Sequence, residues 1–249
     1  MNKEKELQKK ANDQLKQLLT ECNLQIYQGK SILEIGFKNG LFLNECRKAK
    51  LIPTGIEIDK DYCDAVKLKF PHLDLVWYDG GTIPLPDESF DFVVSYQVLE
   101  HVASTKYMLN ECIRLLKPGG IMYHICPNFH SFYDGHFEIF WLPFLNKDSG
   151  RLYLKLLRRY TPYYETLNII KPREVARILR RNNSVEVISL GRAEFMNKFN
   201  LEQIEKVNHK LLQKILKLLL RLRPLTGILI PLIAKADLYY PITIIARKK

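Results

Sequence analysis

The sequence predicts a doubly wound α/β fold, in which helices cover both faces of a mostly parallel sheet. Between residues 31 and 126, short apolar runs alternate with stretches of helical pattern, which is typical of strands and crossover helices. Every connection between two apolar runs is long enough for a crossover, so consecutive strands can run parallel. With 249 residues, 47% of them hydrophobic, the chain can bury the core of one large domain.

The expected elements follow in order. Strands are expected in five apolar segments: 31–35, 52–58, 73–77, 90–95 and 120–126. Helices are expected at 4–21, from Leu41, from Asp61 and over 104–116. Residues 127–150 are crowded with aromatic residues and histidines and follow no period, which indicates a functional loop. Beyond it we expect a basic helical stretch from Arg151, a turn at Pro162, a helix over 172–182, a strand over 184–191, a helix over 201–223, a short apolar segment and a final strand over 239–249.

Charge and cysteines narrow the class of protein. Residues 1–141 hold 16 Lys and Arg against 19 Asp and Glu, whereas residues 142–249 hold 22 against 8. The second part therefore carries a net charge of +14 and suits an anionic partner such as a phosphorylated substrate, a nucleic acid or a lipid surface. The five cysteines are scattered without metal or redox spacing, and the first residues lack the apolar stretch of a secretory signal, so we expect a cytoplasmic protein with reduced thiols.

The segment "SILEIGFKNG" predicts a ligand-binding loop, because a strand that runs into a glycine-bearing loop and then a helix lets the backbone approach a nucleotide. Glu57 ends the second strand about twenty residues later, where a carboxylate can accept hydrogen bonds from ribose hydroxyls. Asp79 follows the third strand at the same edge of the sheet. Glu34, just before Gly36, is placed to balance a cationic group of the ligand.

Four blocks together resemble the class I S-adenosylmethionine-dependent methyltransferases: "ILEIGFKNGLFL", "GIEID", "DGGTIPLPDESFDFVVSYQVLEHV" and "LLKPGGIMYHICPN". The resemblance covers roughly residues 30–128 and implies a Rossmann-like seven-stranded sheet whose last two strands, 184–190 and 239–247, form a reversed hairpin. It also implies S-adenosyl-L-methionine as cofactor. The implied contacts are Glu34, Gly36 and Gly40 around the methionine part, Glu57 on the ribose, Asp79 at the adenine amine and Ser95 to Val98, including Gln97, on the sulfonium side. Phe37, Ile58 and Gly80 complete the expected cofactor-binding set.

Lys38 departs from the family pattern, which usually has a third glycine there. A lysine near a sulfonium cation would weaken binding unless its side chain points to solvent. A protein that keeps the fold but binds a partner without the cofactor is therefore an alternative. We expect the chain to form a single domain over 1–249. It comprises a core over 30–128, an acceptor-site loop over 127–150 and a basic elaboration over 151–249.

Methylation of an alcohol needs a base, and histidine is suited to that role near neutral pH. We predict His136 in the aromatic loop or His101, beside Glu100, as the base, with His130 as a weaker candidate and His124 as structural. Some similar methyltransferases carry Glu-x-x-Glu-His and a later histidine that bind a metal. Here Gln97 stands in place of the first carboxylate and is a poorer ligand for a divalent cation, so we predict no metal.

The basic second part suggests the acceptor. In the expected helix over 201–223 an apolar stripe lies opposite a row of lysines, and an apolar segment too short to span a bilayer follows, which suggests peripheral attachment to an anionic membrane surface. The stretch beyond residue 128 loosely resembles bacterial methyltransferases of cell-surface glycan synthesis. We therefore expect O-methylation of a glycan or other hydroxylated small molecule, with a quinone or phenolic lipid as the alternative. Nucleic acid is not expected, because neither a separate RNA-binding module nor an Asn-Pro-Pro-Tyr or catalytic-cysteine motif is present. The sequence assigns no oligomeric state.

Overall fold

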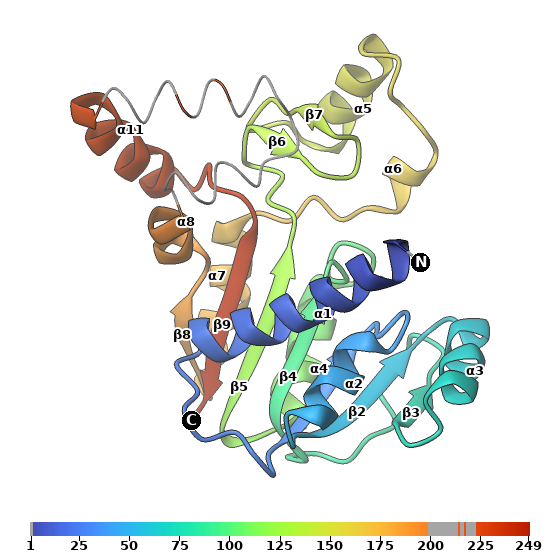
Figure 1. Cartoon of the computed structure of the whole chain (residues 1–249). Helices are drawn as coiled ribbons and strands as arrows, with labels where there is room; N and C mark the ends of the chain where they lie inside the picture. Colours follow the sequence, from blue (N-terminus) through green and yellow to red (C-terminus); the bar gives the residue numbers. More distant parts are fainter. Residues whose placement is uncertain (1, 199–213, 215–216, 218–222) are drawn as a thin grey trace. The chain divides into compact units, whose positions relative to one another are not determined.

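The chain groups into two compact units in the computed structural model (Figure 1). The structure describes residues 2–198, 214, 217 and 223–249. The first unit, here called the sheet unit, comprises residues 1–126, 176–188 and 244–249. The second, here called the loop unit, comprises residues 127–175 and 189–243. The expected helix over 201–223 lies almost wholly outside the described residues.

The main sheet has seven strands, which confirms the predicted doubly wound fold. They are β1 (Ser31–Ile35), β2 (Ile52–Glu57), β3 (Asp74–Trp77), β4 (Phe90–Tyr96), β5 (Leu116–Cys126), β8 (Val185–Ser189) and β9 (Ile242–Lys248). Their order across the sheet is β3-β2-β1-β4-β5-β9-β8, and β1 pairs in parallel with both β2 and β4. Strand β9 runs opposite to β5 in Figure 1, so the last two strands form the expected reversed pair.

The helices of the sheet unit match the expected ones within a few residues. They are α1 (Asn2–Glu21), α2 (Leu41–Lys48), α3 (Lys60–Lys69) and α4 (Thr105–Leu115). The described helices that lie wholly or partly in the loop unit are α5 (Lys147–Leu156), α6 (Tyr163–Thr166), α7 (Pro172–Arg180), α8 (Arg192–Lys198) and α11 (Arg223–Lys235). The expected loop over 127–150 also contains a small antiparallel hairpin of β6 (Tyr133–Asp134) and β7 (Ile139–Phe140).

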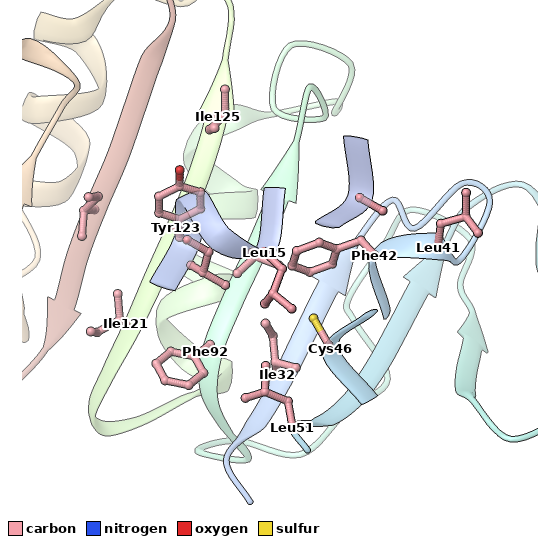
Figure 2. Packing of buried hydrophobic residues seen from close by; sticks show 14 residues of the cluster. Leu15, Ile32, Leu41, Phe42, Cys46, Leu51, Phe92, Ile121, Tyr123 and Ile125 are labelled. Carbon is pink, nitrogen blue, oxygen red and sulfur yellow. The ribbon is translucent and has the colours of Figure 1, made fainter. Parts of the chain in front are cut away.

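Helix α1 covers one face of the sheet with a narrow apolar stripe (Figure 2). Ala11, Leu15 and Leu18 recur at helical spacing, are buried, and pack with core residues such as Ile32 and Phe92. The other faces of α1 are mostly polar, so the apolar stripe is narrow. The sequence therefore shows only weak apolar periodicity. Two further hydrogen bonds hold α1 in place: the Tyr123 hydroxyl donates to Glu21 Oε2 over 2.7 Å, and the Tyr96 hydroxyl donates to the Gln14 carbonyl over 3.2 Å.

Parallel pairing brings the carboxyl ends of several strands to one edge of the sheet. Residues Glu34 and Ile35 of β1 lie opposite Gly55 and Ile56 of β2, and Ser95 of β4 lies opposite Ile35. The loops that leave these strands therefore start side by side, which is where open α/β sheets bind ligands.

Candidate functional site

The loop after β1 is built on left-handed backbone. Gly36, Lys38 and Gly40 have φ of 73°, 53° and 68°. A Cβ on Gly36 would lie 2.7 Å from Val98 Cγ2, and one on Gly40 would clash with Val66, so both glycines are required for close packing as well as for conformation. Lys38 has a backbone conformation that glycine favours, and Lys38 is exposed.

Phe37 points into the core beneath this loop. Its side chain is buried among Leu43, Val66 and Leu75, and a Cβ on Gly55 would lie 2.6 Å from its ring. The ring thus fixes the loop on β2 through packing. Any contact of Phe37 with a ligand would come from its backbone.

Glu57 is held by three backbone N–H groups. Its Oε2 accepts from Lys38 N over 3.1 Å, and its Oε1 accepts from Ile58 N over 2.9 Å and from Asp59 N over 3.3 Å. These bonds fix the carboxylate of a buried residue between the loop after β1 and the end of β2. A carboxylate has about four lone-pair sites, so Oε2 can still accept one further donor, such as a ribose hydroxyl.

Glu34 is a buried carboxylate whose Oε2 has no hydrogen-bond partner. Burial raises its pKa well above the usual range, and repulsion by Glu57 raises it further. Such a group is costly in the free protein, and a cationic ligand group would compensate it. This is the observation by which a cofactor with an ammonium or sulfonium centre fits the residues present.

The ends of β2 and β3 carry an apolar side chain beside a carboxylate. Ile58 is 58% exposed, and a Cβ on Gly80, which has φ of 90°, would lie 3.0 Å from Ile58 Cδ1. Asp79 is exposed, and its Oδ1 accepts from Gly81 N over 2.9 Å. Trp77 Nε1 donates to the Ile58 carbonyl over 2.9 Å and steadies this corner. A flat base with an exocyclic amine suits such a pair of residues.

Ser95 and His124 form a buried pair on adjacent strands. Ser95 Oγ lies 2.8 Å from His124 Nδ1, and both residues are fully buried. Burial lowers the pKa of His124 to about 3, so the ring is neutral at physiological pH, in keeping with a structural role. Gln97 lies two residues after Ser95, just beyond the end of β4. It is exposed with φ of 57°, and its backbone N–H donates to the Ile125 carbonyl over 2.8 Å.

Glu100 and His101 are neighbours after β4 in the sheet unit. Glu100 is fully buried, His101 is exposed, and His101 Nε2 lies 3.8 Å from Glu100 Oε1. This pair retains the geometry needed for an acid or base.

His136 lies in the loop unit, where the structure adds Asp134, a residue that the sequence analysis did not select. Asp134 is buried, and its Oδ1 accepts from His136 N over 3.0 Å and from Phe137 N over 2.8 Å. Its Oδ2 lies 3.8 Å from His136 Nδ1. The ring of His136 also stacks on Phe129 at 6.2 Å with an interplanar angle of 8°. The Asp134 carboxylate and the Phe129 ring thus orient this imidazole. The sequence did carry a signal for the backbone bonds of Asp134, because an aspartate before glycine often accepts from the backbone N–H two residues on.

The surroundings of His130 disfavour its protonated form. Burial lowers its pKa, and the nearby Lys171 and Arg173 lower it further. The His130 ring packs edge-on against Phe144 at 4.4 Å. The backbone N–H of His130 donates to Asn128 Oδ1 over 2.9 Å. These contacts describe a residue that helps to hold the loop.

Comparisons with known proteins identify a family for part of the chain. Residues 33–124 match the family model described as a methyltransferase domain. The chain is 31% identical over 107 residues to a probable S-adenosylmethionine-dependent methyltransferase from Mycolicibacterium smegmatis, which is 43% of the chain and 42% of that relative. It is 29% identical over 129 residues to a ubiquinone biosynthesis O-methyltransferase from Rhizobium rhizogenes, which is 51% of the chain and 48% of that relative. The chain thus matches less than half the length of each of these two relatives.

A solved structure extends the likeness in fold beyond the matched segment. A putative sarcosine dimethylglycine methyltransferase from Galdieria sulphuraria superposes with a TM-score of 0.57 at 15% identity, over 96% of the chain and 86% of that protein. At this identity the likeness concerns the fold. Fold, family match and site geometry agree: residues 33–124 belong to a class I S-adenosylmethionine-dependent methyltransferase domain, and S-adenosylmethionine is the cofactor of that domain.

Proposed function

We propose that the chain transfers a methyl group from S-adenosylmethionine to a hydroxyl oxygen of a small molecule, with a glycan as the favoured acceptor. The arrangement of Glu34 and Glu57 carries the proposal. Glu57 is fixed by backbone N–H groups and keeps one acceptor site, at Oε2, for a ribose hydroxyl, while the buried Glu34 Oε2 lacks a hydrogen bond. A ligand with a ribose hydroxyl and a cationic end matches both carboxylates.

His136 is the base in this proposal, and Asp134 is the residue that orients it. The cofactor's sulfonium makes its methyl carbon electrophilic. The chain's own task is to hold the acceptor oxygen in line behind that carbon and to take its proton. A ring nitrogen of His136 would accept the proton of the acceptor hydroxyl, and the cofactor, held by Glu34 and Glu57, would supply the methyl group to the acceptor oxygen. His101, beside Glu100, is the second candidate for the same role.

The basic second part favours an acceptor that carries or accompanies negative charge. Residues 142–249 hold 22 Lys and Arg against 8 Asp and Glu, which suits a phosphorylated or lipid-linked glycan. The looser resemblance to glycan methyltransferases supports the same class.

Two measurements test the function in sequence. Calorimetry with S-adenosylhomocysteine reports the cofactor site, and transfer of tritiated methyl groups to a panel of free sugars, lipid-linked glycans and phenols reports the acceptor. We expect His136→Ala to lower turnover by about 10²–10⁴-fold without changing cofactor affinity. A variant that loses cofactor affinity but keeps turnover would refute the role of His136.

A quinone or phenolic lipid is the second candidate acceptor. The observation that favours it is the similarity to relatives named ubiquinone biosynthesis O-methyltransferase. Methyl transfer to phenols but to none of the sugars in the same panel would select this candidate.

The non-enzymatic alternative is a protein of the same fold that binds a partner and no cofactor. Lys38, in place of the usual glycine, is the residue that suggests it. Absence of calorimetric heat at millimolar S-adenosylhomocysteine would favour it over both acceptors.

A further inference from the structure

Large apolar side chains are exposed along one segment of the loop unit. Single exposed apolar residues are common, but a concentration of them marks an interaction surface. Seven of them fall between residues 132 and 157: Phe132, Phe140, Leu142, Phe144, Leu152, Leu156 and Leu157. Leu156, at 74%, is the most exposed of the seven.

Helix α5 has two apolar faces. Gly150 and Leu154 are buried, and Leu154 packs with Trp141 and Tyr164. Leu152 and Leu156 lie one turn apart on another side of the helix and are 60% and 74% exposed. Folding of the loop unit therefore uses the first face and leaves the second to water.

The exposed side chains of the hairpin belong to the same packed substructure. The Tyr153 hydroxyl donates to the Phe140 carbonyl over 2.8 Å, which ties α5 to β7. The rings of Phe132 and Phe140 stack at 5.8 Å, although both residues are exposed. One hydrogen bond thus links α5 to β7, and ring stacking joins Phe140 of β7 to Phe132.

Positive charge adjoins these leucines. Residues 149–159 include Arg151, Lys155, Arg158 and Arg159 and no acidic residue. Arg151 is paired with Asp148 and Glu165. Lys155, Arg158 and Arg159 are exposed and make no ion pair within the described part of the chain.

We propose that residues 152–159, together with Phe132 and Phe140, form a docking surface for an anionic membrane. Leucine and phenylalanine side chains enter the acyl boundary of a bilayer, while neighbouring cations meet lipid phosphates. An anionic bilayer matches both features, and no described helix is long and apolar enough to cross a membrane. The proposal deepens the proposed function, because a lipid-linked acceptor lies at such a surface. It is tested without cofactor or acceptor, so its failure leaves methyl transfer untouched.

The test is flotation of the full chain with vesicles of phosphatidylcholine, with and without phosphatidylglycerol. We expect recovery with the anionic vesicles, weakening as salt is raised. The triple variant Lys155→Gln, Arg158→Gln, Arg159→Gln should lower the partition coefficient on the order of 100-fold, from about 1 kcal/mol per cation. The double variant Leu152→Ser, Leu156→Ser should lower it by about tenfold or more.

Matched variants in the sheet unit serve as controls. Leu68 in α3 is 86% exposed, and Lys9 and Lys10 in α1 are exposed. Leu68→Ser and the pair Lys9→Gln, Lys10→Gln should bind vesicles like the unmodified chain. Equal recovery with both kinds of vesicle, or unchanged binding of the triple variant, would overturn the proposal.

A second copy of the chain is the competing occupant of this surface. Light scattering decides it: a dimer that the leucine variant converts to monomer, with no flotation of the unmodified chain, would overturn membrane docking. Circular dichroism and calorimetry with S-adenosylhomocysteine verify that every variant folds.

Discussion

The two units differ in how far apart in the sequence the partners of their polar groups lie. In the sheet unit, three backbone N–H groups fix the Glu57 carboxylate, and the most distant of them, that of Lys38, is 19 residues away. In the loop unit, Asp134 accepts from two nearby N–H groups, but the Asn128 amide donates to the carbonyls of Asp237 and Tyr239, which are 109 and 111 residues away. The first arrangement follows from strand ends and local loop geometry. The second depends on bonds between residues that can lie far apart in the chain, so the two sites should respond differently to substitution.

Replacement of Glu57 should give the largest change in the sheet unit. Glu57→Ala removes a hydrogen bond from a ribose hydroxyl to a charged acceptor, which at about 1.5–3 kcal/mol lowers cofactor affinity about 10–100-fold. Titration calorimetry with S-adenosylhomocysteine measures it. Asp59→Ala is the matched control, because Asp59 caps α3 by accepting from Asp61 N and Tyr62 N. It should cost about 1 kcal/mol of stability and leave affinity unchanged. Equal affinity losses in both variants would mean that Glu57 acts only by holding the loops.

Replacement of Asp134 tests whether the loop unit orients a base. Asp134→Asn keeps an acceptor for the two N–H groups but removes the charge 3.8 Å from His136 Nδ1. We expect kcat to fall roughly tenfold, because the imidazole loses the carboxylate that orients it, and cofactor affinity to stay unchanged. Glu138→Gln, an exposed neighbour, is the control. An equal fall of kcat in both variants, or an equal loss of cofactor affinity in Asp134→Asn, would leave Asp134 a structural role only.

Glu34 separates binding from stability. Its raised pKa means that the folded protein holds a proton more tightly than the unfolded chain, so stability is fully present below the ordinary carboxyl pKa and falls as pH rises through the folded-state pKa. Glu34→Gln should abolish this fall and raise the free energy of unfolding at neutral pH by about 1 kcal/mol, roughly 2–4 °C in Tm. The same variant should gain less stability from added S-adenosylmethionine than the unmodified chain. Thermal melts from pH 4 to pH 8, with and without cofactor, would contradict this if the two proteins ran parallel.

Lys38→Gly should give the smallest change. The substitution relieves left-handed backbone at φ of 53° and keeps the N–H that binds Glu57, so we expect a stability gain of about 1 kcal/mol or less. Because Lys38 is exposed, cofactor affinity should change by less than about threefold. A tenfold gain in affinity would show that the lysine side chain repels the bound cation.

The sheet unit could be predicted almost completely from the sequence. Its central strands are buried, so they read as continuous apolar runs, and Gly36, Gly40 and Glu57 stand at the strand ends where such sheets bind nucleotides. Lys38 was recognised as a departure, but its exposure and its N–H bond to Glu57 required coordinates.

The loop unit could be predicted only in part. The β6–β7 hairpin has two residues in each strand, too few to show a period, and α8 went unrecognised. The start of α5 at Lys147 did have a local signal, because Asn146 and Ser149 form a capping box. Asp134 also had a local signal for its backbone bonds, since it is an aspartate before glycine, but no sequence pattern reports the 3.8 Å between its carboxylate and a ring nitrogen of His136.

The position of β9 has a consequence for synthesis of the chain. Strand β9 lies between β5 and β8, yet the ribosome makes both of these before it makes residues 242–248. A nascent chain therefore presents the long, apolar β5 with one unpaired edge until its final segment emerges. During that interval the open edge of β5 can pair with the same strand of another chain. Exchange of β9 between two copies is therefore a characteristic hazard of this topology, and a chaperone that covers the edge would reduce it.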